Sequence, residues 1–165
     1  MEQLSDTYSY IPAFLDLDIA SSFLSLLRDN TSWGRFAFSP NSRLVSQWTS
    51  ENKGEVDLIM NGVIAEIEQR YGLRVRGVFL NWYKNGGDYC PYHADMYGTN
   101  VLTLSLGENR DLLIKRNGPG KANKLTLSSG DLYYMSAAMQ HTHKHSIPKR
   151  KGANGDRISV VFFTT

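Results

Sequence analysis

A chain of 165 residues and 18.6 kDa is long enough for one compact domain, spanning residues 1–165, and short for two. Its 41% hydrophobic and 21% charged residues exclude a disordered or collagen-like chain, and no apolar run approaches the roughly 20 residues that span a bilayer, so no membrane partner is expected. The net charge of +2 is uneven: residues 1–80 hold 7 Lys and Arg against 10 Asp and Glu, a net −3, and residues 81–165 hold 11 against 6, a net +5.

Two helices are expected in the first half of the chain. The first follows Asp16 or Asp18, either of which can cap a segment whose apolar residues recur at helical spacing. The second covers Glu55 to Arg70 and stops at Gly72. We therefore expect residues 1–73 to form a helical support.

From residue 74 onward, short segments rich in Val, Ile, Leu, Phe and Tyr alternate with Gly- and Asn-rich turns, which predicts strands. These segments are 74–83, 99–106, 111–116, 124–128, 131–135, 143–147 and 157–164. Two helices followed by such strands indicate an α+β fold, a small β-sandwich or open barrel with helices buttressing one face. Residues 74–165 would then be a β-rich catalytic core.

Cysteine usage bears on the compartment. The single cysteine, Cys90, excludes an intramolecular disulfide, and residues 1–6 lack the segments of a signal peptide. We expect an intracellular, reducing compartment, the cytoplasm or the nucleus. We also expect a monomer without a disulfide-linked partner.

His93 and Asp95 are the first candidate metal ligands. In an extended segment, residues two apart point to the same side, so the two side chains can act together. One further imidazole from a distant strand would complete a set of two His and one carboxylate, which binds Fe(II) and leaves coordination positions open. The alternative is a partly buried His hydrogen-bonded to its neighbouring Asp. A zinc site on Cys90 and His93 is improbable, because no second paired Cys is present.

Three further histidines stand close together, at His141, His143 and His145. If the stretch is extended, all three share one face, and a second metal site is conceivable. The simpler interpretation is that one of them is a ligand and the other two lie at the surface or behind the site.

The last predicted strand carries a possible anion-binding group. By its period of two, Arg157, Ser159, Val161 and Phe163 share a face. If this face looks into the barrel, the Arg157 guanidinium is buried and needs an anionic partner, for which a ligand carboxylate is suited. The alternative is an exposed arginine at a strand edge.

Taken together, these residues resemble the AlkB-like branch of the Fe(II)/2-oxoglutarate dioxygenases over about residues 76–163. Many short matches occur in the order typical of that family. They are Asn81-Trp82-Tyr83, His93-Ala94-Asp95, Leu104-Ser105-Leu106-Gly107 followed by Arg110, Gly130-Asp131-Leu132 with Met135, His145-Ser146-Ile147-Pro148, and Arg157-Ile158-Ser159. Within the histidine cluster, His145 fits this pattern and His141 and His143 do not.

The resemblance implies a double-stranded β-helix, which is a jelly-roll-like pair of sheets with the metal between them. It implies Fe(II), 2-oxoglutarate as cosubstrate and O2. It also implies iron ligation by His93, Asp95 and His145, contacts of Asn81 and Tyr83 with 2-oxoglutarate, pairing of Arg157 with its distal carboxylate, and a pocket lined by Ser159.

The implied activity is oxidative demethylation or dealkylation of nucleobases in DNA or RNA, with nucleic acid as the partner. The basic second half could bind phosphates through Arg110, Lys115, Arg116, Lys121, Lys124, Lys149, Arg150 and Lys151. One alternative is the same oxygenase chemistry acting on a nucleoside, a small metabolite or a protein side chain. Another is a binding module that keeps the family's shape without catalysis.

Two positions depart from the family pattern. The family usually carries a second arginine six residues after the first, near the metal-side end of the cosubstrate, and here that position is Phe163. Chelation by the metal, or a Lys or Arg elsewhere, could compensate. Tyr97 stands where nucleic-acid repair members commonly carry an acidic residue, so their substrate does not transfer directly to this chain.

Overall fold

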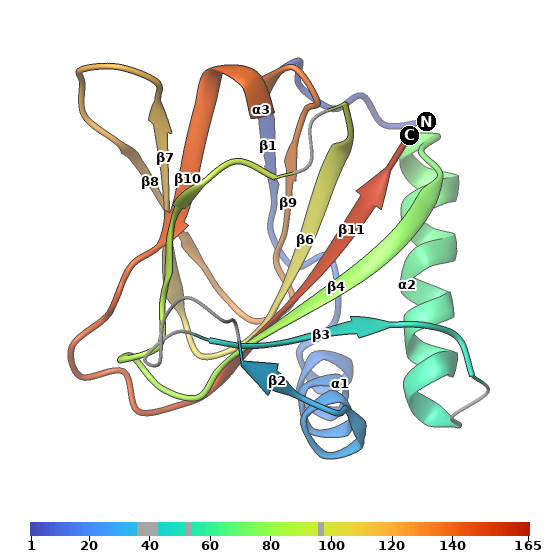
Figure 1. Cartoon of the computed structure of the whole chain (residues 1–165). Helices are drawn as coiled ribbons and strands as arrows, with labels where there is room; N and C mark the ends of the chain where they lie inside the picture. The colour runs from blue at the N-terminus through green and yellow to red at the C-terminus, as the bar shows by residue number, and fades with distance from the viewer. Residues whose placement is uncertain (36–42, 52–53, 96–97) are drawn as a thin grey trace.

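The computed structural model describes residues 1–35, 43–51, 54–95 and 98–165 (Figure 1). Within these residues the helices are α1 (Leu17–Asn30), α2 (Glu55–Tyr71) and the short α3 (Met139–Thr142). The strands are β1 (Tyr8–Ile11), β2 (Gly34–Arg35), β3 (Leu44–Trp48), β4 (Val75–Tyr83), β5 (Cys90–His93), β6 (Asn100–Gly107), β7 (Arg110–Arg116), β8 (Asn123–Leu127), β9 (Leu132–Met135), β10 (His143–Ile147) and β11 (Arg157–Thr164).

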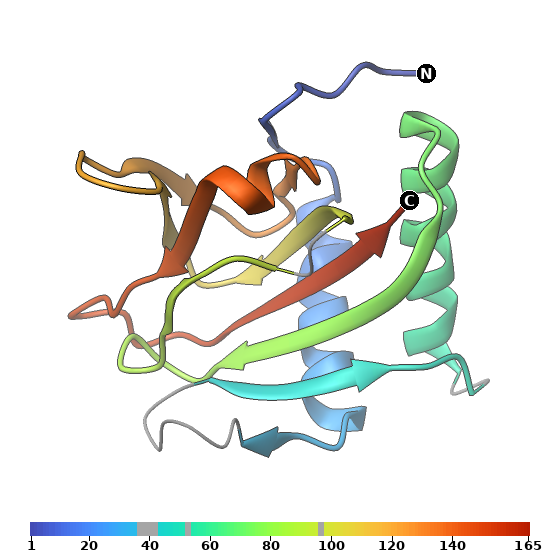
Figure 2. The same cartoon turned by 45° about the horizontal axis from the view of Figure 1, so that its top comes forward.

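The strands form two antiparallel sheets. The large sheet has the order β1-β9-β6-β11-β4-β3-β2, and the small sheet has the order β5-β10-β7-β8. Helices α1 and α2 cover one face of the large sheet, and the small sheet lies on its other side (Figures 1 and 2). The predicted α+β class is confirmed.

The alternation of side chains along the central strands explains both faces of the large sheet. Leu80, Val160 and Leu104 lie side by side on β4, β11 and β6, and all three are buried in the core beneath the helices. In the next row Asn81, Ser159 and Ser105 are paired in the same way, and their side chains face the small sheet. On β4, β6 and β11, one face therefore packs into the core beneath the helices, and the other face can carry the side chains of a binding site.

Helix α2 begins at the predicted Glu55 and ends at Tyr71, one residue after the predicted end, and α1 follows Asp16, one of its two predicted caps. Gly72 follows α2 in a left-handed conformation, with φ of 69°, and its N–H donates to the carbonyl of Glu68. Asp16 precedes α1, but its side chain makes no capping hydrogen bond. Among the described residues, no helix is both long enough and apolar enough to cross a bilayer.

The first half of the chain contributes more than helices. β1 adds to the edge of the large sheet by pairing with β9, and β3 pairs with β4 over Leu44 to Trp48. The expectation of a purely helical support over residues 1–73 is therefore incomplete, as is the absence of β5 from the predicted strands. These strands are short, and each is held by a partner that the local sequence does not indicate.

Candidate metal centre and the adjoining pocket

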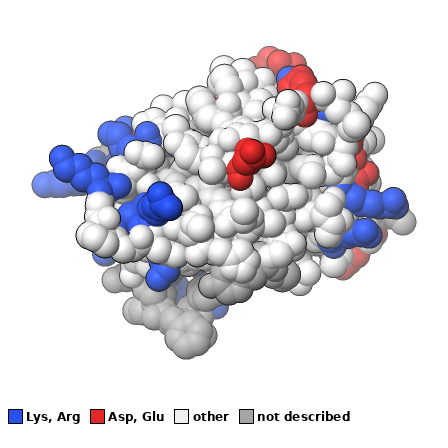
Figure 3. All heavy atoms as spheres, turned by 90° about the horizontal axis from the view of Figure 1, so that it is seen from above, with Lys and Arg blue, Asp and Glu red and all other residues white. Residues whose placement is uncertain are grey.

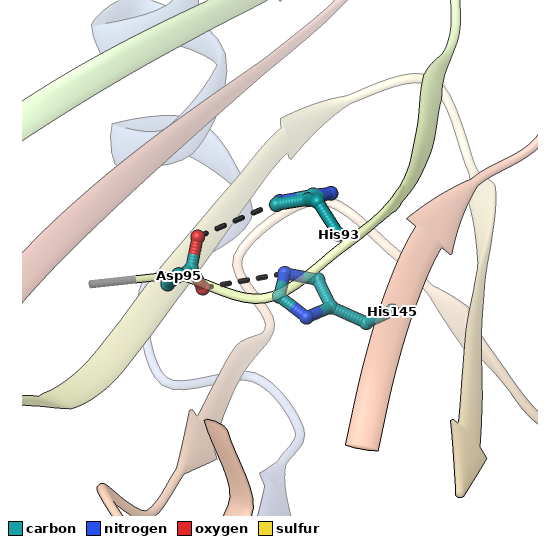
Figure 4. Close-up of side chains that lie close together, drawn as sticks. All are labelled: His93, Asp95 and His145. Atoms are coloured by element: carbon teal, nitrogen blue, oxygen red, sulfur yellow. Dashed lines mark ion pairs between the residues drawn. The ribbon is translucent and has the colours of Figure 1, made fainter. Parts of the chain in front are cut away.

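His93, Asp95 and His145 come together at the inner face of the small sheet (Figure 4). His93 ends β5 and is paired with His145 on β10, and Asp95 follows two residues after β5. The Nε2 atoms of His93 and His145 lie 3.5 Å and 3.3 Å from the two carboxylate oxygens of Asp95. One potential ligand atom from each residue lies within 4.8 Å of the others, so this group could hold a metal ion.

Neighbouring groups orient these ligands. Nδ1 of His93 is 2.8 Å from the carbonyl oxygen of Pro91, which suits an Nδ1–H donor and leaves Nε2 facing Asp95. The backbone N–H of Asp95 donates to Oε1 of Gln140 at 2.8 Å. Both contacts hold ligand atoms in place before any ion binds.

The electrostatics of the group favour a bound cation. Burial lowers the pKa of His93, but hydrogen bonds with Asp95 and Cys90 outweigh it and raise the pKa to about 10. Burial raises the pKa of Asp95, yet the hydrogen bonds from His145 and His93 hold it well below its ordinary value. Without an ion, the protonated His93 supplies positive charge beside the Asp95 carboxylate, and a divalent ion would take its place as the imidazole loses that proton.

The other arrangements considered for the histidines are not formed. Cys90 Sγ lies 3.4 Å from His93 Nδ1, on the ring nitrogen turned away from Asp95, and it is not part of the cluster. His141 is exposed on α3, so the three clustered histidines do not share one extended face. Among the described residues, His93, Asp95 and His145 are the only such group close enough for a metal.

A pocket of about 330 Å³ adjoins the cluster and extends across the inner face of the large sheet. The seven residues named as candidate ligands and cosubstrate contacts all line it. Its lining comprises Arg43, Phe79, Asn81, Tyr83, Cys90, His93, Asp95, Thr103, Tyr133, His145, Ile147, Arg157, Ser159, Val161 and Phe163. The shared face predicted for Arg157, Ser159, Val161 and Phe163 is thus the inner face.

Arg157 is an unsatisfied cation in this pocket. The residue is 1% exposed, and its Nε donates to Ser105 Oγ at 2.8 Å. Its Nη1 and Nη2 atoms are buried and have no hydrogen-bond partner among the described residues. The guanidinium carbon lies 5.3 Å from the centroid of the Tyr83 ring, but buried N–H groups without an acceptor are costly, and the two terminal nitrogens match a carboxylate. The pocket therefore suits an anionic ligand such as 2-oxoglutarate, and Arg157 is not an exposed strand-edge residue.

Asn81 is held from both sides. Its Nδ2 donates to Ser159 Oγ at 3.1 Å, and its Oδ1 accepts a 2.5 Å hydrogen bond from Nε of Arg43. Arg43, directly before β3, is 9% exposed and lines the pocket, although no motif in the sequence marks it. Burial holds the pKa of Tyr83 above its ordinary value, so Tyr83 is a neutral hydroxyl.

Arg110 was wrongly placed among the phosphate-binding residues. It is 1% exposed and lies over the ring of Tyr83, with the guanidinium carbon 5.2 Å from the ring centroid. Its Nη2 donates to the carbonyls of Asp88 and Pro148, both at 2.7 Å. Arg110 therefore joins the loops after β4 and β10. Tyr97, the other departure from the family pattern, lies outside the described residues.

Comparisons with known proteins agree with this geometry. The family model of the 2OG-Fe(II) oxygenase superfamily matches residues 60–162. DNA oxidative demethylase ALKBH2 of Arabidopsis thaliana is 32% identical over 119 residues, which cover 55% of this chain and 38% of that protein. The match thus spans well under half the length of this relative.

Solved structures share the fold at low sequence identity. OsALKBH1 superposes with a TM-score of 0.68 and 15% identity over 98% of both chains. A prolyl-4-hydroxylase of Pseudomonas putida superposes with a TM-score of 0.66 and 14% identity, covering 96% of this chain and 92% of that one. The expected double-stranded β-helix and the AlkB-like resemblance are confirmed.

Proposed function

Because the chain belongs to the 2OG-Fe(II) oxygenase superfamily, we propose that it is an Fe(II)- and 2-oxoglutarate-dependent dioxygenase that demethylates or dealkylates nucleobases in DNA or RNA. One observation carries the proposal. A single pocket has a cluster of two His and one Asp at one side and the unpaired, buried nitrogens of Arg157 at the other. A metal ion and a carboxylate-bearing cosubstrate satisfy these two features together.

In this proposal His93, Asp95 and His145 hold Fe(II), and Asn81, Tyr83, Arg157 and Ser159 receive 2-oxoglutarate. When bound, the iron supplies oxygen activation, by which 2-oxoglutarate is decarboxylated to succinate and a C–H bond of the substrate is hydroxylated. Arg157 fixes the carboxylate far from the metal, and the Tyr83 hydroxyl offers a neutral hydrogen bond beside it. Phe79, Val161 and Phe163 line the same wall and help to exclude water.

The charge distribution supports nucleic acid as the substrate class. We define the basic end as Lys115, Arg116, Lys121, Lys124 and Lys144, which lie on or beside β7, β8 and β10. Lys and Arg side chains gather at the left of Figure 3, where this end lies, and the acidic side chains in that view lie elsewhere. A positive surface of this kind attracts phosphates without reading sequence.

Two of these lysines are directly opposed. Lys144 on β10 is paired with Lys115 on β7, an arrangement in which like charges destabilise a sheet. A bound phosphate would relieve this repulsion. Lys144 directly precedes His145 and points to the opposite face of β10, so Lys144 and Lys115 lie on the face of the small sheet turned away from the metal cluster.

A second candidate is the same oxygenase chemistry on a nucleoside, a small metabolite or a protein side chain. The observation in its favour is the apolar lining around Phe163 and Phe79, which accepts an uncharged group. For either substrate we propose a monomer in a reducing intracellular compartment, where the free thiol of the buried Cys90 is stable.

The test measures succinate and formaldehyde released with Fe(II), 2-oxoglutarate and O2. The substrates are methylated single- and double-stranded DNA and RNA, with methylated nucleosides and peptides as controls. Formaldehyde from a methylated oligonucleotide, lost in His93→Ala, is the expected result. Turnover of nucleosides or peptides alone would favour the second candidate. Failure to bind Fe(II) and 2-oxoglutarate anaerobically would overturn the oxygenase assignment.

A further inference from the structure

The pocket contains a second guanidinium that no family motif places there. Arg43 lies one residue before β3, whose Leu44 and Val45 pair with Trp82 and Asn81 of β4. Continuing this register brings Arg43 beside Tyr83, which is itself paired with Arg157 on β11. Arg43 and Arg157 therefore flank Tyr83 from the two neighbouring strands, and both line the pocket.

Both guanidiniums that line the pocket are largely buried. Arg43 is 9% exposed and Arg157 is 1% exposed, so both cations are largely removed from water. Among the described lining residues, Asp95 is the only carboxylate, and its oxygens face the two imidazoles. Buried charges persist when they are matched by opposite charge. Two guanidiniums at one side of the pocket can both contact the carboxylate of 2-oxoglutarate that lies far from the metal.

We propose that Arg43 is a cosubstrate-binding residue, which supplies from β3 the second positive charge that Phe163 does not supply from β11. The inference rests on the proposed function, because it takes 2-oxoglutarate as the ligand. Phe163 also lines the pocket. It lies six residues after Arg157 on β11, on the same face of the strand, and it pairs with Gly77 of β4. The second positive charge is therefore that of Arg43, which lies before β3 at the end of the pocket that holds Arg157.

The contact of Arg43 with Asn81 offers a competing role. Nε of Arg43 donates to Oδ1 of Asn81, and Nδ2 of Asn81 donates to Oγ of Ser159, so the three residues form a chain of hydrogen bonds. Arg43 could act only by orienting Asn81. A double-mutant cycle distinguishes the two roles. If Arg43 contacts the cosubstrate directly, removing its charge still weakens 2-oxoglutarate binding in a protein that lacks the Asn81 amide. If Arg43 only orients Asn81, removing its charge has no further effect there.

The experiment measures 2-oxoglutarate binding by titration calorimetry on the full chain loaded with Mn(II), which occupies the metal site without turnover. Arg43→Gln is expected to raise the Kd for 2-oxoglutarate by about 10- to 100-fold, the loss of one charge-assisted hydrogen bond. Arg43→Lys keeps the charge and should give an intermediate Kd. The control is Arg74→Gln, the same change at an exposed residue before β4, and it should bind like the original protein.

Two further variants sharpen the outcome. Adding Phe163→Arg to Arg43→Gln should restore part of the affinity, and no recovery would overturn the claim that the two positions supply the same charge. In an Asn81→Ala background, Arg43→Gln should still raise the Kd. If its effect disappears there, Arg43 is a positioning residue that acts through Asn81, and direct contact with the cosubstrate is overturned.

The controls separate this inference from the proposed function. If the original protein does not bind 2-oxoglutarate, the proposed function fails. If the original protein binds and Arg43→Gln binds equally well, only the role of Arg43 fails. Thermal unfolding and Mn(II) affinity verify that each variant is folded. If Arg43→Gln does not fold, the Kd of Arg43→Lys decides, and a value equal to that of Arg74→Gln overturns the inference.

Discussion

His145 differs from its two neighbouring histidines in where its ring points. Its Nε2 lies 3.3 Å from Asp95 and its side chain is buried, whereas His141 is exposed on α3 and His143 contacts Thr142 Oγ1 at 2.8 Å. We predict that His145→Ala abolishes Fe(II) binding, because two ligands do not hold the ion. His141→Ala and His143→Ala should keep most of the affinity. Anaerobic Fe(II) titration measures all three, and an equal loss in each would refute the assignment.

Arg157 should show opposite effects on stability and on binding. Its two terminal nitrogens are buried without a partner, so the guanidinium costs free energy in the unliganded protein. We predict that Arg157→Met raises the free energy of unfolding without ligand by about 1 kcal/mol, while it weakens 2-oxoglutarate binding at least tenfold. Urea unfolding and calorimetry measure the two quantities. A variant that is both less stable and equally able to bind would contradict this account.

At the scale of elements, Asp131 ties the amino-terminal strand to the turn between β8 and β9. Its carboxylate accepts hydrogen bonds from the Tyr10 hydroxyl at 2.6 Å, the Ala13 N–H at 3.0 Å and the Ser128 N–H at 2.8 Å. Asp131→Asn removes the charge and one acceptor. We therefore predict a loss of about 2 kcal/mol in the free energy of unfolding, with an unchanged Kd for 2-oxoglutarate, measured by urea unfolding and calorimetry.

Tyr10→Phe is the matched control for this tie. The hydrogen bond with Asp131, aided by burial, raises the pKa of Tyr10 to about 12, so the folded state favours the neutral hydroxyl. Its contribution is present below the ordinary tyrosine pKa of about 10 and is lost as the pH rises through about 12. The stability difference between the original protein and Tyr10→Phe should shrink over that range. A difference that stays constant would remove Asp131 as its cause.

The helices and strands show which features of the fold the sequence alone could predict. The strands after residue 74 were predictable, because apolar alternation and glycine turns mark them locally, and the candidate ligands were predictable because short motifs carry them. β1 and β3 are only 4 and 5 residues long, and their partners β9 and β4 are fixed by pairing across the sheet. Arg43 could not be singled out, because its position in the pocket depends on that pairing.

In the folded protein, part of the excess positive charge of the second half of the chain is gathered at the basic end. The net +5 of residues 81–165 includes the basic end, whose Lys115 and Lys144 lie on the face of the small sheet opposite to His145. Arg110 is buried and does not contribute to this surface. The exposed lysines are thus free to meet phosphates, and the strength of that contact can be measured separately from catalysis.

Lys115→Glu combined with Lys144→Glu tests this surface, because the two lysines are directly opposed across β7 and β10. The reversal should weaken binding of a single-stranded oligonucleotide and leave the Kd for 2-oxoglutarate unchanged. For a single strand, each phosphate contact contributes about −0.7 to the slope of log K against log salt, so losing two contacts should make the slope about 1.4 less negative. Fluorescence anisotropy over a range of NaCl concentrations measures it, with Arg74→Glu as the control distant from the basic end. An unchanged slope would mean that phosphates do not bind at Lys115 and Lys144, and the basic end would then no longer support nucleic acid as the substrate class.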